Sequence, residues 1–348
     1  DVNECDLLEY LIDDPDTGVI GLYLESIPNG QKFIDLCRGS EKPIVVLRGG
    51  KSQKGAEAAL SHTASIAGNG AVISGALAQV GVVEAHDFKQ LMDLCRTLAD
   101  YPEIQPENSR RVAILTMSGA AGIVSSDFIE EHDLAVADLS VSTLEALKEI
   151  FPGWMPVSNP VDLWPAVELH GRKKAYTKAF EAVCADPGVD AVLFHGFVGG
   201  DAFRPDISVL VERAGRAGKP VFGWVMGNRT ETHKLQVQAK KLGLPVFGEL
   251  YRSVECMAAV LSRRKLPADR PNRITLSETS VAEKELQNLL MDASGTLDEY
   301  HSKQIQGYPE LIAGLIRDPQ FGPCVMCGFG GILAEVMADS VFAAAPLS

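Results

Sequence analysis

Short apolar runs alternate with longer amphipathic stretches along most of the chain. The apolar runs at residues 19–24 and 44–47 predict buried strands, and the stretch 31–37 between them predicts a helix. Two more helices are expected over residues 71–80 and 87–98, on either side of a short apolar segment at Val82 and Val83. This order of strand, helix and strand is typical of a β-α-β unit, in which the strands are parallel.

A second series of strands and helices begins after residues 101–110, a polar stretch with two prolines that predicts a domain boundary. Strands are expected at residues 112–116, 134–137, 191–196, 220–225 and 245–247. Helical patterns lie between and after them, at residues 121–131, 143–150, 172–184, 207–217, 232–242 and 252–262. This alternation predicts an α/β fold with doubly wound parallel sheets, each covered by helices on both faces.

The two ends of the chain do not predict complete domains. One β-α-β step in the first hundred residues cannot close a core alone. The basic, proline-bearing segment 263–273 is typical of a linker, and the part after about Thr296 is too short for a whole domain. We therefore expect a fragment, a subunit of a larger assembly, or a chain that lacks internal segments.

Composition and charge narrow the function classes. The 348 residues are 46% hydrophobic with a formal net charge of −14, so a nucleic-acid-binding surface is not expected. Anionic ligands stay possible, because backbone amides at helix starts bind phosphate without bulk positive charge. The sequence has no apolar stretch of membrane-spanning length, and its acidic start does not resemble a signal peptide. These features favour a cytoplasmic protein without a membrane partner.

The seven cysteines are scattered among apolar residues, which predicts reduced, buried thiols. Cys324 and Cys327 form a C-x-x-C pair that could be half a zinc site or a redox couple. The alternative is two positions in a buried strand, and we favour it because no second Cys/His pair lies close by.

The chemistry is expected at His62, which lies in a small-residue loop directly after the apolar run 44–47. Open α/β sheets bind ligands where strands end, and an imidazole can act as a nucleophile near neutral pH. A lone loop histidine can equally be an ordinary surface residue. Lys51 could attract phosphate, and with a weaker case so could Lys54, while the alternative for both is an ordinary solvated loop lysine. His195 ends a strand and is expected to be a satisfied core or rim histidine, while the other histidines are expected at the surface: His86, His132, His170, His233 and His301.

Residues 50–68 resemble the phosphohistidine loop of the ADP-forming acyl-CoA synthetases, relatives of succinyl-CoA synthetase. In that family the S-H-T segment carries the histidine that is transiently phosphorylated, which implies this role for His62. Residues 19–33 resemble the strand that ends in an acidic residue contacting the phosphohistidine, and Glu25 has that position. A carboxylate on one ring nitrogen would fix the tautomer, whereas without the resemblance Glu25 would be a solvated residue at a strand end.

Two further matches concern phosphate and nucleotide. Residues 112–131 resemble the strand, turn and helix whose N-terminus points at the phosphate in this family, which makes Ser118, Gly119, Ala120 and Gly122 candidate phosphate contacts. The NPVD element at residues 159–162 also has a counterpart, which we interpret as a structural turn. Residues 296–305 and 321–348 resemble the start and the later strands of an ATP-grasp domain.

The resemblance implies four parts. They are a partial flavodoxin-like (Rossmann-like) domain at residues 1–100, a second one at 107–265, a linker at 266–295 and a partial ATP-grasp domain at 296–348. The family's CoA-binding domain and the middle of its ATP-grasp domain are expected to be missing from this chain.

The reaction implied is acyl-CoA + ADP + phosphate ⇌ carboxylic acid + CoA + ATP, with Mg²⁺ at the nucleotide and a homo- or hetero-oligomeric enzyme. The alternatives are the synthetase-like body of a protein lysine acetyltransferase, or a non-catalytic CoA- or nucleotide-sensing subunit.

Overall fold

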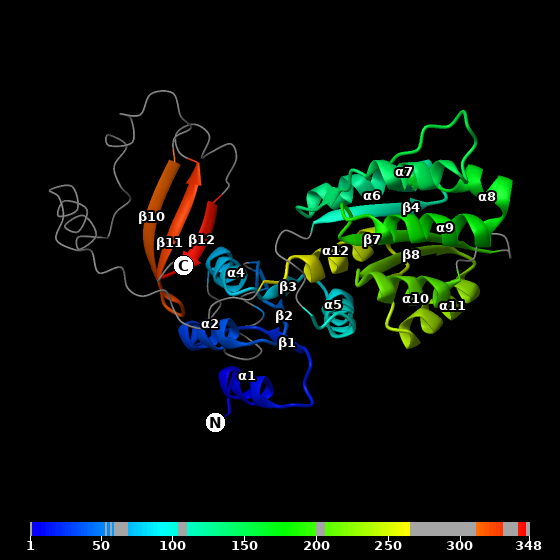
Figure 1. The fold of residues 1–348 in the computed structure, drawn as a ribbon. Helices are drawn as coiled ribbons and strands as arrows, with labels where there is room; N and C mark the ends of the chain where they lie inside the picture. The colour runs from blue at the N-terminus through cyan, green and yellow to red at the C-terminus, as the bar shows by residue number, and fades with distance from the viewer. Residues whose placement is uncertain are drawn as a thin grey trace. The chain divides into compact units, whose positions relative to one another are not determined.

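The computed structural model describes residues 2–52, 54–55, 58, 69–103, 110–199, 206–264, 311–329 and 340–345 (Figure 1). The chain divides into two compact units. The first comprises residues 1–95 and 265–348, and the second comprises residues 96–264. Each unit has its own hydrophobic core, built from strands in its centre and helices packed on them.

The first unit contains a small parallel sheet. Its strands β1 (Ile20–Leu24), β2 (Ile44–Arg48) and β3 (Val83–Ala85) are hydrogen-bonded in that order. All five residues of β2 are buried, as expected for the central strand of a sheet covered on both faces. The helices of this part are α1 (Glu4–Asp13), α2 (Gly30–Gly39), α4 (Gly70–Gln79) and α5 (Phe88–Asp100), whose residues from Arg96 onward belong to the second unit.

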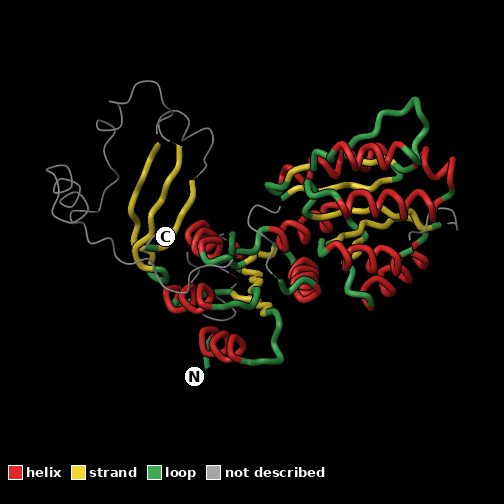
Figure 2. The backbone as a smooth tube through the Cα atoms, viewed as in Figure 1, coloured by secondary structure: helices red, strands yellow, loops and turns green. Residues whose placement is uncertain are grey.

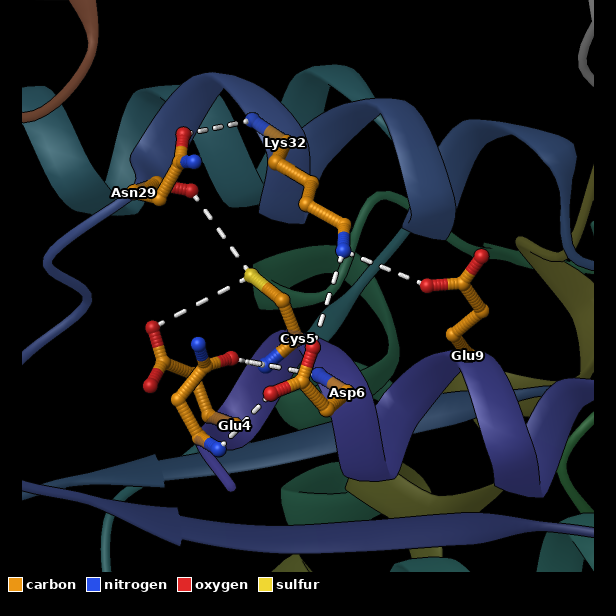
Figure 3. A network of polar contacts seen from close by, with 7 residues as sticks. Glu4, Cys5, Asp6, Glu9, Asn29 and Lys32 are labelled. Atoms are coloured by element: carbon orange, nitrogen blue, oxygen red, sulfur yellow. Dashed lines mark hydrogen bonds and ion pairs between the residues drawn. The ribbon is translucent and has the colours of Figure 1, made fainter. Parts of the chain in front are cut away.

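The first helix, α1, was not predicted. Asn3 and Asp6 form a capping box at its N-terminus, and Cys5 and Leu8 bury one face of the helix in the core. Figure 3 shows how this helix is joined to α2: Lys32 lies 3.8 Å from a carboxylate oxygen of Asp6 and 3.2 Å from one of Glu9. Burial raises the pKa of the Cys5 thiol to about 11, so Cys5 is a protonated, unreactive core residue at neutral pH.

Three antiparallel strands complete the first unit. They are β10 (Leu311–Asp318), β11 (Gly322–Phe329) and β12 (Ser340–Ala344), drawn in yellow with the other strands in Figure 2. Phe321 at the turn before β11 is fully buried, and Gln31 of α2 donates a hydrogen bond to its carbonyl oxygen. Gln79 at the end of α4 donates to the Ala344 carbonyl and accepts from its amide, both at 3.0 Å. The strands that resemble ATP-grasp therefore pack on the helices of the flavodoxin-like part.

The second unit is a parallel sheet with strand order β5-β4-β7-β8-β9, and β6 also pairs with β4. The strands are β4 (Arg111–Thr116), β5 (Ala135–Val136), β6 (Val161–Asp162), β7 (Ala191–Val198), β8 (Val221–Gly227) and β9 (Val246–Phe247). Its helices are α6 (Gly119–Glu131), α7 (Val141–Lys148), α8 (Trp164–His170), α9 (Arg172–Ala185), α10 (Ile207–Ala217), α11 (Arg229–Lys241) and α12 (Leu250–Leu261). Helices α6 and α12 pack together on the sheet, while α9 packs on β4 and β7 and contacts α7, α8 and α10.

The predicted fold class, parallel-sheet α/β with a partial ATP-grasp segment, is confirmed. Every strand and helix that the patterns predicted before residue 263 is present, with shifts of a few residues at the ends. The unpredicted elements of this part are α1, β3, β6 and α8, of which β3 lies at the short apolar segment of Val82 and Val83. The sequence also predicts a polar helical stretch at residues 280–290, which lies outside the described residues.

Candidate functional site

The predicted site residues fall in both units. Glu25 and Lys51 belong to the first unit, whereas Ser118, Gly119, Ala120 and Gly122 belong to the second. His62 lies outside the described residues. The geometry is therefore given for each unit separately.

Glu25 directly follows β1 and lies at the carboxyl edge of the first sheet. Leu24 is paired with Arg48 in the parallel ladder, so β1 and β2 end side by side. The Tyr23 hydroxyl donates a hydrogen bond to Glu25 at 3.2 Å, and a Cβ built on Gly49 would lie 3.4 Å from the Glu25 Cγ. The Glu25 side chain thus lies over the first residue of the segment that joins β2 to α4, the segment that contains His62.

Lys51 forms an ion pair with Glu84 in β3, with 2.7 Å between the Lys51 Nζ and a carboxylate oxygen. The same carboxylate oxygen accepts a hydrogen bond from the Nε of Arg48 at 2.8 Å. Sequence reasoning missed both Arg48 and Glu84. The signal was a charged residue in each of two otherwise apolar strands, IVVLR and VEA.

Helix α6 of the second unit begins at the predicted turn. Ser118 is its N-cap, and its hydroxyl accepts a hydrogen bond from the Ala121 amide at 3.4 Å. Gly119 and Ala120 are exposed at the start of this 13-residue helix, and backbone amides in the first turn of a helix can bind an anion. A Cβ on Gly119 would lie 3.6 Å from an Asp162 carboxylate oxygen, so this carboxylate already lies beside the helix N-terminus.

Gly122 has a packing role in the structure. It is buried, and a Cβ there would lie only 3.0 Å from the Cβ of Pro160 and 3.3 Å from the Cγ2 of Thr116. The absence of a side chain therefore lets α6 lie close to the turn that contains Pro160.

The NPVD element holds β4 next to β5. The Asn159 side chain accepts from the Ile114 amide at 2.8 Å and donates to the carbonyls of Val112 at 2.8 Å and Ala137 at 2.9 Å. The peptide bond that follows it, Asn159–Pro160, is cis. The interpretation of this element as a structural turn agrees with these contacts.

His195 is a fully buried histidine with both ring nitrogens hydrogen-bonded. Nδ1 lies 2.9 Å from the Thr116 hydroxyl and Nε2 lies 3.1 Å from the Ser125 hydroxyl. Burial lowers the pKa of His195 to about 3, so the ring is neutral at physiological pH. The prediction of a satisfied core histidine is confirmed. The Thr116 hydroxyl also accepts from the Ser118 amide at 3.0 Å, which links the buried ring to the N-cap of α6.

Other predictions had mixed outcomes. All seven cysteines are free, and Cys324 is buried as expected, but the prediction that Cys327 is also buried was wrong. Side chains three residues apart in a strand point to opposite faces, so only one of the two can face the core. Within the described part of the chain, no three His, Cys, Asp or Glu side chains gather as metal ligands. The histidines His86 and His233 are exposed, whereas His132 and His170 are half-buried and His301 lies outside the described residues. A search of the described helices found none long and apolar enough to cross a membrane.

Comparison with known proteins supports the predicted resemblance. Residues 1–98 match the family described as succinyl-CoA ligase like flavodoxin domain, and residues 297–348 match the family described as ATP-grasp domain. Acetate–CoA ligase (ADP-forming) II of Archaeoglobus fulgidus is 34% identical over 270 residues, which are 76% of this chain and 39% of the relative. Acetate–CoA ligase (ADP-forming) I of the same organism is 27% identical over 434 aligned positions, covering 100% of this chain and 62% of the relative.

A solved structure is also similar. It is the dinucleotide forming acetyl-coenzyme A synthetase 1 of Ca. Korarchaeum cryptofilum in complex with phosphate and ADP, with a TM-score of 0.66 and 28% sequence identity. The match covers 75% of this chain and 56% of that one. The similarity to ADP-forming acyl-CoA synthetases predicted from the motifs is thus confirmed, and the chain spans less than two thirds of the length of each of these three proteins.

Proposed function

We propose that this relative of the ADP-forming acyl-CoA synthetases is part of an enzyme that interconverts acyl-CoA, ADP and phosphate with a carboxylic acid, CoA and ATP. The observation that carries the proposal is the parallel pairing of Leu24 with Arg48. It brings Glu25 and the start of the segment containing His62 to one edge of one sheet, the edge where open α/β sheets bind ligands.

The reaction divides into three balanced steps. An oxygen of phosphate attacks the thioester carbonyl carbon, the C–S bond breaks, and CoA leaves as a thiolate, giving an acyl phosphate. A ring nitrogen of His62 then attacks the phosphorus, the P–O bond to the acyl group breaks, and the carboxylate leaves. Finally an oxygen of the ADP β-phosphate attacks the same phosphorus, the P–N bond breaks, and ATP forms. One difficult transfer is thus replaced by easier ones.

This chain's own residues would position and stabilise the phosphoryl group. A hydrogen bond from His62 to Glu25 would fix the imidazole tautomer and leave the other ring nitrogen free to attack. The amides of Gly119 and Ala120, in the first turn of the helix that Ser118 caps, would stabilise the phosphoryl charge, and the buried Gly122 would let α6 pack close to the turn that contains Pro160. Lys51 would contribute positive charge at the start of the segment that carries His62.

The ligands follow from this reaction. They are a small carboxylic acid or its acyl-CoA, phosphate, CoA and an adenine nucleotide. Mg²⁺ would accompany the nucleotide and offset its charge, but the described residues form no metal site, so no step is assigned to it. The free cysteines agree with a reducing compartment such as the cytoplasm, and we expect a homo- or hetero-oligomer. The acetyltransferase-scaffold and sensor alternatives are not favoured, since the similar proteins reported above are named as ligases or synthetases.

The test is mass spectrometry of the full-length protein after incubation with Mg·ATP. We expect an acid-labile phosphate on the peptide that holds His62, absent from a His62→Ala variant and present in a His86→Ala control, which removes an exposed histidine of the same unit. Absence of this phosphate from a protein that binds nucleotide would contradict the proposal.

A further inference from the structure

Four polar side chains meet at the two ends of the segment 49–69, which connects β2 to α4. Arg48 is the last residue of β2, Lys51 lies three residues later, Ser74 is on α4 and Glu84 is in the middle of β3. We call these four residues the loop-base cluster. The cluster is only partly open to solvent, with side-chain exposures of 6% for Arg48, 17% for Glu84 and 36% for Lys51.

The Glu84 carboxylate is the centre of the cluster. One of its oxygens contacts the Arg48 Nε at 2.8 Å and the Lys51 Nζ at 2.7 Å, and the other accepts from the Ser74 hydroxyl at 2.7 Å. Burial alone would raise the pKa of Glu84, but the hydrogen bonds from Lys51, Ser74 and Arg48 outweigh it and lower the pKa overall. Glu84 is therefore ionised at neutral pH.

Arg48 also contacts α4 directly. Its guanidinium donates through one nitrogen to the Ser74 hydroxyl at 2.7 Å and to the Gly70 carbonyl at 3.1 Å. Gly70 begins α4, and the side chain of the preceding residue, Asn69, accepts hydrogen bonds from the first amides of that helix. Residues immediately before and immediately after the segment 49–69 are thus joined by direct side-chain contacts.

The cluster is not required to pair the strands. The backbones of β2 and β3 are already paired from Val45 with Val83 to Leu47 with Ala85. Charges that are shielded from water add little stability to a pair of strands, because the free energy lost on their desolvation offsets most of their attraction. What the cluster adds is a fixed distance between the two ends of the segment that carries His62.

We propose that Glu84 is a positioning residue for phosphoryl transfer, because its carboxylate ties Arg48, just before the segment, and Lys51, at the start of the segment, to Ser74 after it. This inference rests on the proposed function, in which His62 within that segment accepts and donates the phosphoryl group. Fixed ends restrict where His62 can go, and a misplacement of about 1 Å can cost roughly a hundredfold in rate. Glu84 touches no reacting atom in this scheme.

The test compares rates of His62 phosphorylation by saturating Mg·ATP in the full-length protein. The variants are Glu84→Gln, which keeps the side-chain size and removes the charge, Ser74→Ala, which removes the hydrogen bond from α4 to Glu84, and Ser74→Thr, which keeps the hydroxyl. Lys32→Gln is the matched control, because it removes an ion pair of the same unit that does not contact the loop-base cluster. Thermal unfolding and the ATP concentration at half-maximal rate are measured for each variant.

We expect the phosphorylation rate to fall at least tenfold in Glu84→Gln and in Ser74→Ala, with ATP affinity within threefold of wild type. Ser74→Thr should restore most of the rate, and Lys32→Gln should leave it unchanged. If Glu84→Gln fails to fold, the comparison of Ser74→Ala with Ser74→Thr still tests the inference. Wild-type rates in folded Ser74→Ala or Glu84→Gln protein would overturn the inference alone, whereas no label on wild-type His62 would overturn the proposed function as well.

Discussion

Replacing His195 by glutamine tests how a buried neutral histidine couples the stability of the second unit to pH. In the folded protein burial lowers the pKa of His195 from 6.5 to about 3, and the ring is hydrogen-bonded on both sides. The unfolded chain therefore binds a proton near pH 6 that the folded chain does not bind. The stability that the neutral ring contributes is fully present above pH 6.5 and is lost as the pH falls toward 3.

The size of the effect follows from the two pKa values. Between pH 8.0 and pH 5.5 the unfolded state gains about 1.4 kcal/mol from protonation of this one imidazole, and the folded state gains almost nothing. The wild-type free energy of unfolding should therefore drop by about 1.4 kcal/mol more over this interval than that of His195→Gln, which has no titrating group there. Carboxylates such as Asp186 and Asp190, whose pKa values are lowered, titrate alike in both proteins and cancel in the comparison.

Urea unfolding followed by tryptophan fluorescence is the suitable assay. The three tryptophans, Trp154, Trp164 and Trp224, all lie in the second unit, and the Trp224 ring is 5.2 Å from that of His195. The signal therefore reports on the unit that contains the substitution. Equal losses of unfolding free energy in wild type and variant between pH 8.0 and 5.5 would refute the account of His195 as a buried neutral base.

Three further predictions concern other contacts. Asn159→Ala should lower the free energy of unfolding of the second unit by about 3 kcal/mol, since three backbone hydrogen bonds of about 1 kcal/mol each are lost, and the same urea assay measures it. Gly75→Ala should free β12 from α4, because a Cβ there would overlap the Phe342 carbonyl oxygen. Faster hydrogen exchange in residues 340–344 is the expected result, and unchanged exchange would count against this packing. Glu25→Gln should slow phosphorylation of His62 by roughly tenfold to hundredfold at unchanged ATP affinity, measured by rapid quench, and an unaltered rate would remove Glu25 from the mechanism.

The sequence predicted the strands and helices before residue 263 because burial there follows clear periods. The run IVVL is apolar throughout and forms the buried centre of the first sheet, and AVLFHGFV forms β7, whose histidine is buried. The missed helix α1 had a signal in Asn3 and Asp6, the capping box, and in the spacing of Cys5 and Leu8 on one face.

Contacts between segments far apart in the chain could not be predicted from the sequence. The link of Glu84 to Arg48 depends on which strand lies beside which, and the burial of Phe321 depends on α2, nearly 300 residues earlier. The exposure of Cys327 follows from the alternation of side chains along a strand, whereas the sequence pattern was interpreted as burying both Cys324 and Cys327. Local patterns carry no information about such neighbours, so the loop-base cluster could only be found from the folded chain.

The most direct test of the central claim is whether phosphorylated His62 forms and decays fast enough to lie on the reaction path. Full-length protein would be mixed with acetyl-CoA and radiolabelled phosphate, quenched in alkali on the millisecond scale, and then chased with ADP. The account predicts that label appears on His62 and passes to ATP, each at least as fast as steady-state turnover. Formation of ATP at a higher rate than labelling of His62 would contradict the account. Formation of ATP by a His62→Ala variant would also contradict it.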